Sequence, residues 1–274
     1  MNDLSIYIPT YKRSGKVSTI KYLGKSAMHM VNLVTRHDEA EAYKAAYPGI
    51  NVLPLPESTT NLSQTRQWIM DNCPTRFLMQ LDDDLDLHKR PDRKDYHLRP
   101  LVEDQFSEML EEMRAFMDQN EIVHCAVSAR EGNNRNPEDW RFNQRYMRAY
   151  IFDLDVVRKF KYSEPCCGTE DFHMALQLLT AGYRSAVMFC YAQGQGTSNA
   201  KGGLSTYRTI EYHNNAMAKL QEAFPKYVKL RNVKTKTAWQ GMERVDATVK
   251  WKEAYKNSPK IVGAECPPAE RLHP

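Results

Sequence analysis

Short apolar segments alternate with longer amphipathic segments over the first 86 residues. Apolar and β-branched runs of four to eight residues predict strands, and apolar residues that recur every three or four positions predict helices. Strands are expected at 4–8, 29–35, 51–56 and 76–81, and helices at 18–28, 40–47 and 61–70. This strand–helix alternation is typical of a doubly wound α/β sheet with parallel strands.

The second half of the chain continues the alternation less regularly. Strands are expected at 122–128, 147–154 and 186–191, with an amphipathic helix at 103–120 and a helix between an N-cap at Thr169 and a stop at Gly182. Residues 206–256 look largely helical and basic. We therefore predict an α/β domain over residues 1–205, with halves 1–86 and 87–205, and a basic, largely helical C-terminal extension over 206–274 packed on it.

Three consecutive carboxylates, Asp82, Asp83 and Asp84, directly follow the apolar strand at 76–81. Adjacent carboxylates repel one another unless a cation or hydrogen-bond donors offset the repulsion. Ligands in open α/β sheets bind beyond the carboxyl ends of the strands, and oxygen ligands suit Mg²⁺ or Mn²⁺. These residues predict a divalent metal site, whereas the alternative is a solvated acidic turn. The charged, proline-containing segment 87–96 is predicted to be a solvated loop.

The first strand ends in a cluster of side chains that suit a nucleotide. Pro9 and Thr10 are followed by an aromatic ring, Tyr11, and by Lys12 and Arg13. An aromatic ring can stack on a base, and cations can pair with phosphates. A polar loop without a ligand is the alternative.

These motifs resemble the nucleotide-sugar-binding half of glycosyltransferases of the GT-A fold. In that family the first strand ends in Ile-Pro-Thr-Tyr followed by a basic residue, here Ile8 to Arg13, and the fourth ends in Asp-x-Asp, here Asp82 to Asp84. The spacing of the two motifs also resembles the family, and Arg66 matches its usual basic position. The resemblance covers residues 4–86 and implies a Rossmann-like, mostly parallel central sheet flanked by helices.

The resemblance also implies roles for individual residues. A divalent ion, Mn²⁺ or Mg²⁺, would be held by Asp84 with Asp82 and would bridge the phosphates of a nucleoside diphosphate sugar, expected to be a UDP-sugar. His213 is the one histidine that closely follows the last predicted strand, where many GT-A enzymes place a further metal ligand. The nucleotide-sugar contacts implied in this way are Pro9, Thr10, Tyr11, Arg13, Arg66, Asp82, Asp83 and Lys201.

The predicted helix after Thr169 opens with Glu170 and Asp171 and ends in Ala-Gly-Tyr. Acidic residues at a helix start are also explained by the helix dipole. The pair nevertheless resembles the acceptor-side signature of GT-A transferases, in which a carboxylate takes the proton from the attacking hydroxyl. The resemblance implies Asp171 as the catalytic base, with Glu170 as the alternative.

Composition limits which binding partners and which cellular compartment we expect. The net charge of +4 permits a polyanionic partner without requiring one. The chain has no apolar stretch of eighteen residues, so no membrane association is expected. Its N-terminal residues lack the pattern of a signal peptide, which predicts a cytoplasmic protein, in the host cytoplasm if the source is viral. The six cysteines lack zinc-site spacing and are expected to be reduced thiols.

The compact size and the basic, aromatic segments resemble those of phage-type and TET-associated DNA glycosyltransferases. This resemblance implies an acceptor hydroxyl on a hydroxymethylated pyrimidine in DNA. Three alternatives stay open from the sequence: a GT-A transferase acting on a glycan or another small acceptor, a nucleotidyltransferase, and a non-catalytic nucleic-acid-binding protein on a transferase scaffold.

Overall fold

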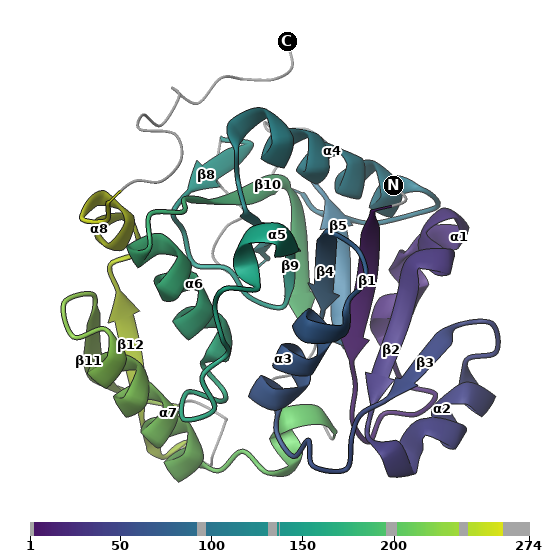
Figure 1. The fold of residues 1–274 in the computed structure, drawn as a ribbon, viewed down its shortest axis with the longest axis horizontal. Helices are drawn as coiled ribbons and strands as arrows, with labels where there is room; N and C mark the ends of the chain where they lie inside the picture. The colour runs from purple at the N-terminus through teal and green to yellow at the C-terminus, as the bar shows by residue number, and fades with distance from the viewer. Residues whose placement is uncertain are drawn as a thin grey trace.

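The computed structural model describes residues 3–91, 97–130, 136, 138–195, 202–235 and 241–259. Within these residues a ten-stranded mixed sheet runs through the molecule, with helices on both faces (Figure 1). The strand order is β3-β2-β1-β4-β9-β7-β10-β5-β6, and β8 pairs with β10 beside this path. In sheet order the strands are β3 (Asn51–Pro54), β2 (Val31–Thr35), β1 (Leu4–Pro9), β4 (Phe77–Leu81), β9 (Ala149–Asp153), β7 (His124–Ala129), β10 (Ser185–Gln195), β5 (Leu85–Lys89), β6 (Arg99–Pro100) and β8 (Trp140–Phe142).

The first half of the sheet is the predicted parallel unit. β1 pairs in parallel with both β2 and β4, and β2 pairs in parallel with β3. All five residues of β4 are buried, because helices cover both faces of the strand. The connecting helices are α1 (Gly24–Ala27), α2 (Ala40–Ala46) and α3 (Leu62–Asn72). The α/β architecture predicted from the hydrophobic pattern is confirmed.

The second half of the sheet adds antiparallel strands. β9 lies antiparallel between β4 and β7, while β7 and β10 are parallel to each other. β10 also pairs antiparallel with β5. The prediction of a solvated loop from residue 87 was wrong for residues 87–89, which belong to β5. Leu85 and Leu87 alternate along this strand and are buried in the core, so the charged residues around them concealed a strand.

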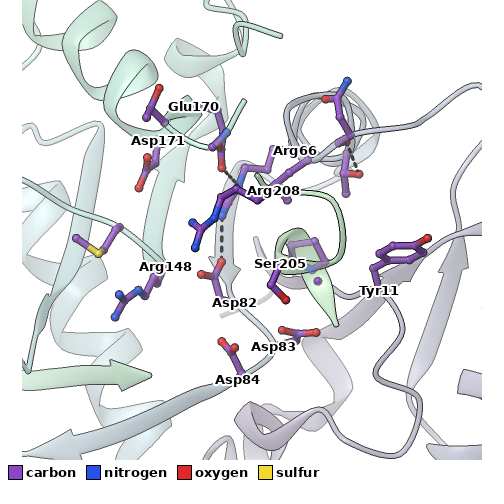
Figure 2. A pocket seen from close by; sticks show the side chains of 18 of the residues that line it. Tyr11, Arg66, Asp82, Asp83, Asp84, Arg148, Glu170, Asp171, Ser205 and Arg208 are labelled. Carbon is purple, nitrogen blue, oxygen red and sulfur yellow. Dashed lines mark hydrogen bonds and ion pairs between the residues drawn. The ribbon is translucent and has the colours of Figure 1, made fainter. Parts of the chain in front are cut away.

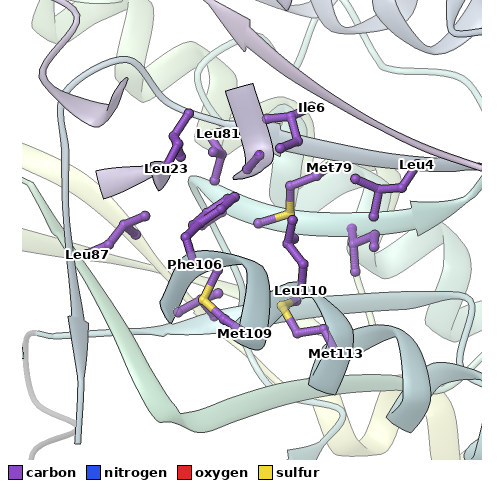
Figure 3. Packing of buried hydrophobic residues seen from close by; sticks show 14 of the residues in the cluster. Leu4, Ile6, Leu23, Met79, Leu81, Leu87, Phe106, Met109, Leu110 and Met113 are labelled. Atoms are coloured by element: carbon purple, nitrogen blue, oxygen red, sulfur yellow. The ribbon is translucent and has the colours of Figure 1, made fainter. Parts of the chain in front are cut away.

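The amphipathic helix predicted at 103–120 is α4 (Gln105–Asn120). Figure 3 shows its apolar face against the sheet, where Phe106, Met109, Leu110 and Met113 meet side chains of β1 and β4. On the other face, α3, α5 (Leu154–Val157) and α6 (Glu170–Thr180) contribute to a second apolar cluster. The three- and four-residue spacing therefore identified core positions correctly.

The single helix predicted at 18–28 is interrupted. A 3₁₀ turn at Ser18–Tyr22 is followed by Gly24, which has φ of +68° and begins the short helix α1. A Cβ atom at Gly24 would collide with the backbone carbonyl of Glu103. Glycine is therefore required both by the left-handed backbone and by the close approach of the segment before α4.

The segment after residue 209 is only partly helical, which corrects the prediction of a largely helical extension. An antiparallel hairpin, β11 (Val228–Lys234) and β12 (Glu243–Val249), lies between α7 (Ile210–Ala223) and α8 (Trp251–Lys256). The hairpin forms because one face carries Leu230, Ala247 and Val249, which pack against an apolar cluster shared with α6, α7 and α8. Among the described residues, no helix is both long and apolar enough to cross a membrane.

Candidate active site

A polar cavity of about 420 Å³ opens beyond the carboxyl ends of β1 and β4. It is bounded by α3, by the start of α6 and by residues from α7 and β12. Figure 2 shows the aspartates after β4 and the carboxylates of α6 around one common space. Eleven residues predicted from the sequence line it: Pro9, Thr10, Tyr11, Arg13, Arg66, Asp82, Asp83, Asp84, Glu170, Asp171 and His213. The predicted phosphate contact Lys201 lies outside the described residues.

The turn that carries the three aspartates is held by Thr19. Its hydroxyl donates to the backbone carbonyl of Asp82 at 2.7 Å and accepts from the backbone N–H of Leu85 at 2.8 Å. Thr19 is fully buried, so both bonds are shielded from water. The 3₁₀ turn after β1 therefore fixes the position of the acidic tip of β4.

The three carboxylates have different partners. Asp83 accepts from the Thr10 hydroxyl at 2.7 Å and pairs with Arg13, and burial raises its pKa to about 6 despite these two contacts. Asp84 pairs with Arg13 at 2.8 Å and accepts from the Gln195 amide. Asp82 is held by Arg66 at 3.0 Å, and burial raises its pKa.

Exposure separates the outer two aspartates from the middle one. The side chains of Asp82 and Asp84 keep 24% and 20% of their surface exposed, against 8% for Asp83. In the described part of the chain, no three His, Cys, Asp or Glu side chains converge as a ready-made metal cage. Mg²⁺ and Mn²⁺ are commonly bound by one or two carboxylates together with substrate phosphates and water. The donor set of Asp84 and Asp82 fits that mode of binding.

Arg66 connects the acidic tip of β4 with the start of α6. Its guanidinium donates to Asp82 at 3.0 Å, to Glu170 at 3.1 Å and to Gln80 at 3.2 Å, and it also contacts the Tyr150 hydroxyl. Burial by itself would lower the pKa of Arg66, but the surrounding oxygens raise it well above its ordinary value. The sequence suggested a phosphate contact for Arg66, whereas its observed partners are protein oxygens.

Glu170 and Asp171 are distinguished by their contacts. Glu170 is buried, with one carboxylate oxygen on Arg66 and the other accepting from the Gly168 backbone N–H at 2.7 Å. Asp171 is partly exposed, and its carboxylate accepts from the Phe172 N–H at 2.8 Å. Burial and the Glu170 charge raise the pKa of Asp171 to about 7. Thr169 holds the N-cap position, as predicted, but its hydroxyl accepts no N–H of the helix and instead donates to the Cys166 carbonyl.

The opposite end of the cavity is lined by Tyr11, Arg36 and Leu55. The Arg36 guanidinium is held by the carbonyls of Thr59 and Thr60, and its central carbon lies 5.3 Å from the centroid of the Tyr11 ring. An aromatic ring beside a cation that is held in place suits the stacking of a planar base. The predicted role of Tyr11 as a base contact stays a prediction that this geometry allows.

His213 lies on α7 and lines the cavity. Its Nε2 atom lies 2.9 Å from the backbone carbonyl of Val245 in β12, and burial lowers its pKa. A neutral ring tied to the hairpin in this way explains the burial of His213 without a metal. Its role as a metal ligand stays a prediction.

Several cavity residues escaped the sequence analysis as site residues. Gln195 reaches Asp84 from the end of β10, while Arg208, Arg244 and Asp246 line the cavity from the segment after residue 205. No local motif marks these residues. For Arg244 and Asp246, the alternation of polar and apolar residues in 243–249 is a signal that predicts a strand with a polar face.

The fold and the site define a class. A parallel unit with an acidic tip on β4, which faces the carboxylates of α6 across a polar cavity, has the architecture of a GT-A glycosyltransferase. The structure of S. aureus TarS with UDP-GlcNAc is similar, with a TM-score of 0.55 and 14% identity over 82% of this chain and 67% of that one. So is glucosyl-3-phosphoglycerate synthase from Mycobacterium tuberculosis in complex with Mn²⁺, UDP and phosphoglyceric acid, with a TM-score of 0.54 and 7% identity over 90% and 86% of the two chains.

Sequence comparison then identifies the family. A profile of the family described as TET-Associated Glycosyltransferase matches residues 4–203, so the chain belongs to that family and is a glycosyltransferase. A curated relative, the beta-glucosyl-HMC-alpha-glucosyl-transferase of Enterobacteria phage T6, is 25% identical over 236 residues, which cover 81% of each chain. The nucleotidyltransferase and the non-catalytic binding protein, both left open by the sequence, gain no support from these comparisons.

Proposed function

We propose that this glycosyltransferase moves a sugar from a nucleoside diphosphate sugar, expected to be a UDP-sugar, to a hydroxyl on a hydroxymethylated pyrimidine in DNA. The observation that carries the proposal is that Asp82, Asp84 and Asp171 line a single cavity. The phage relative, whose name describes transfer to a glucosylated HMC acceptor, supports the choice of acceptor.

The donor would bind between the first strand and the acidic tip. Tyr11 and Arg36 would contact the base, and Asp84 with Asp82 would hold Mn²⁺ or Mg²⁺. When bound, the ion would neutralise charge on the diphosphate leaving group. Arg13 and Gln195 hold the Asp84 carboxylate in place before any ligand arrives, which lowers the cost of ordering the site.

The acceptor would bind on the α6 side. Asp171 is the better candidate for the base, because Glu170 already uses both carboxylate oxygens on Arg66 and Gly168. A raised pKa suits a carboxylate that takes a proton near neutral pH. In this proposal Arg66 is a positioning residue, since it keeps Glu170 and Asp82 fixed while Asp171 stays available.

A base within a duplex is not accessible to such a cavity. The modified pyrimidine would therefore be unstacked, or presented on a single strand, before its hydroxyl approaches Asp171. The cost of unstacking is a few kcal/mol, which contacts to the DNA backbone would have to offset.

The decisive experiment is an assay of product formation by mass spectrometry. The protein is incubated with Mn²⁺, with UDP-glucose or UDP-GlcNAc, and with oligonucleotides that contain cytosine, 5-hydroxymethylcytosine or glucosylated 5-hydroxymethylcytosine. A mass gain of one sugar, found with a modified oligonucleotide and absent with cytosine, supports the proposal. The two modified substrates separate addition to the base hydroxyl from addition to a sugar already attached.

Donor binding is measured separately. A nucleotide sugar that binds the folded state raises the midpoint of thermal unfolding, and the shift should require Mn²⁺. If the nucleotide sugar stabilises the protein in a metal-dependent way but no sugar is transferred to any of the oligonucleotides, the proposed donor is supported and the proposal of a DNA acceptor is overturned.

A further inference from the structure

The two faces of the β11–β12 hairpin differ in chemistry. Cross-strand partners share a face, so Leu230 with Ala247 and Val228 with Val249 form the face that packs on the apolar cluster. The pairs Lys229–Thr248, Arg231–Asp246 and Val233–Arg244 form the other face. That second face carries three cations against one carboxylate.

The cations on this face lie in a row. Arg244 of β12 pairs with Val233 of β11. Arg231 lies two residues before Val233, and Lys229 lies two residues before Arg231. Two residues of a strand span about 6.8 Å, so the three positions are evenly spaced along the hairpin. Lys229 and Arg231 are exposed, and the Asp246 carboxylate lies 3.6 Å from Arg231 and 3.7 Å from Arg244. We name Lys229, Arg231 and Arg244 the hairpin strip.

The hairpin strip begins inside the candidate active site. Arg244 and Asp246 line the same cavity as Asp171. Arg145 lines this cavity too, and its guanidinium lies 4.6 Å from the centroid of Phe172, the residue after Asp171. A positively charged path therefore leads from the acceptor side of the cavity outward along β11.

We propose that the hairpin strip binds the phosphate backbone of the acceptor DNA and guides the modified base to Asp171. This inference rests on the proposed function and names the surface that would serve it. Phosphate contacts by Lys and Arg supply much of the affinity for DNA, and an evenly spaced row of cations suits a chain of phosphates. The family profile ends at residue 203, so the hairpin lies outside the part of the chain that the profile matches.

The test is the salt dependence of DNA binding by the full chain. Fluorescence anisotropy of a labelled duplex that contains 5-hydroxymethylcytosine gives Kd over a series of NaCl concentrations. Each phosphate contact contributes about 0.9 to the slope of log K against log [salt], so Lys229→Gln/Arg231→Gln should flatten that slope by nearly two. Affinity at low salt should fall at least about tenfold.

A matched variant controls for the loss of two charges. Lys25→Gln/Lys44→Gln removes two exposed cations from α1 and α2, on the opposite side of the molecule from the hairpin (Figure 1). This variant should bind DNA like the unmodified protein. An equal loss in both variants, or an unchanged slope in the hairpin variant, would overturn the assignment.

Two further readouts separate this inference from the proposed function. Transfer to the free nucleoside 5-hydroxymethyl-2′-deoxycytidine, which has no phosphate, should not depend on Lys229 or Arg231. If the hairpin variant loses transfer to the nucleoside and to DNA equally, the hairpin strip is not a phosphate contact. If the hairpin variant flattens the salt slope as expected but the unmodified protein transfers no sugar, the proposed reaction fails and the DNA-binding surface is still supported.

Discussion

The Nε atom of Arg66 lies 3.1 Å from Oε1 of Glu170, although 104 residues separate the two along the chain. The same guanidinium holds Asp82 at 3.0 Å. One buried cation thus ties the acidic tip of β4 to the start of α6, and the two walls of the cavity cannot move apart without breaking an ion pair.

Replacing this cation should be costly. Arg66→Met leaves Asp82 and Glu170 without their buried counter-charge, and we expect a loss of about 3–5 kcal/mol in the free energy of unfolding, measured by urea denaturation. The double variant Arg66→Met/Glu170→Gln also removes one of the two carboxylates left without a counter-charge. It should therefore recover part of the lost free energy of unfolding. A single variant as stable as the parent would show that the buried pair contributes nothing.

Asp84→Asn tests the metal site. The variant removes one negative charge at the position proposed to hold Mn²⁺, so stabilisation by UDP-glucose with Mn²⁺ should disappear and transfer should fall at least about 100-fold. Thermal-shift titrations with Mn²⁺ measure the first effect. The control is Asp86→Asn, two residues away, because Asp86 bonds Tyr22 outside the cavity lining. Equal Mn²⁺ responses in the two variants would contradict the assignment.

Asp171 predicts the pH dependence of the reaction. A general base acts when deprotonated, and the pKa of Asp171 is raised to about 7, so kcat/KM should increase with pH and level off above that value. Asp171→Asn should abolish this rise together with transfer. A flat profile between pH 5 and 8 in the parent protein would argue against Asp171 as the base.

The same raised pKa predicts an effect on stability. The folded protein holds the Asp171 proton more tightly than the unfolded chain, whose carboxyl titrates near the ordinary value of 3.8. Stability therefore decreases as pH rises from about 4 to about 7, and Asp171→Asn should flatten this dependence. Denaturation midpoints of both proteins at pH 5 and pH 8 measure the difference, with the variant expected to be relatively more stable at pH 8.

A substitution at Gly202 tests how closely this glycine packs against the Arg13 side chain. Its φ is +102°, and a Cβ there would lie 2.6 Å from Cγ of Arg13, so Gly202→Ala should displace Arg13 from Asp83 and Asp84. We expect weaker binding of UDP-glucose with Mn²⁺ in thermal-shift titrations. Gly49→Ala is the matched control, because Gly49 has φ of +88° but open space around it. Both variants place an alanine at a positive φ and should lose stability for that reason. Only Gly202→Ala should also weaken the binding of UDP-glucose.

The sequence by itself determined the elements whose evidence is local. The apolar run before Asp82 predicted β4, and the apolar spacing within 103–120 identified the core face of α4. The helix predicted at 61–70 is α3, which Asn61 caps by accepting the N–H of Gln64. Such patterns are visible in sequence because side-chain periodicity and capping involve neighbours in the chain.

Only the tertiary structure decided which polar groups meet. Arg66 was expected to face phosphate, but the fold brings it to the tip of β4 and the start of α6, where Asp82 and Glu170 are its partners. The same contact distinguishes the two carboxylates at the start of α6. Both oxygens of Glu170 have hydrogen-bond partners, whereas Asp171 faces the cavity. The strands β5 and β12 were also missed. Polar and apolar residues alternate in both, but the apolar partners that stabilise them lie far away in the chain. Contacts across a hundred residues depend on how whole elements dock, and no local pattern records that.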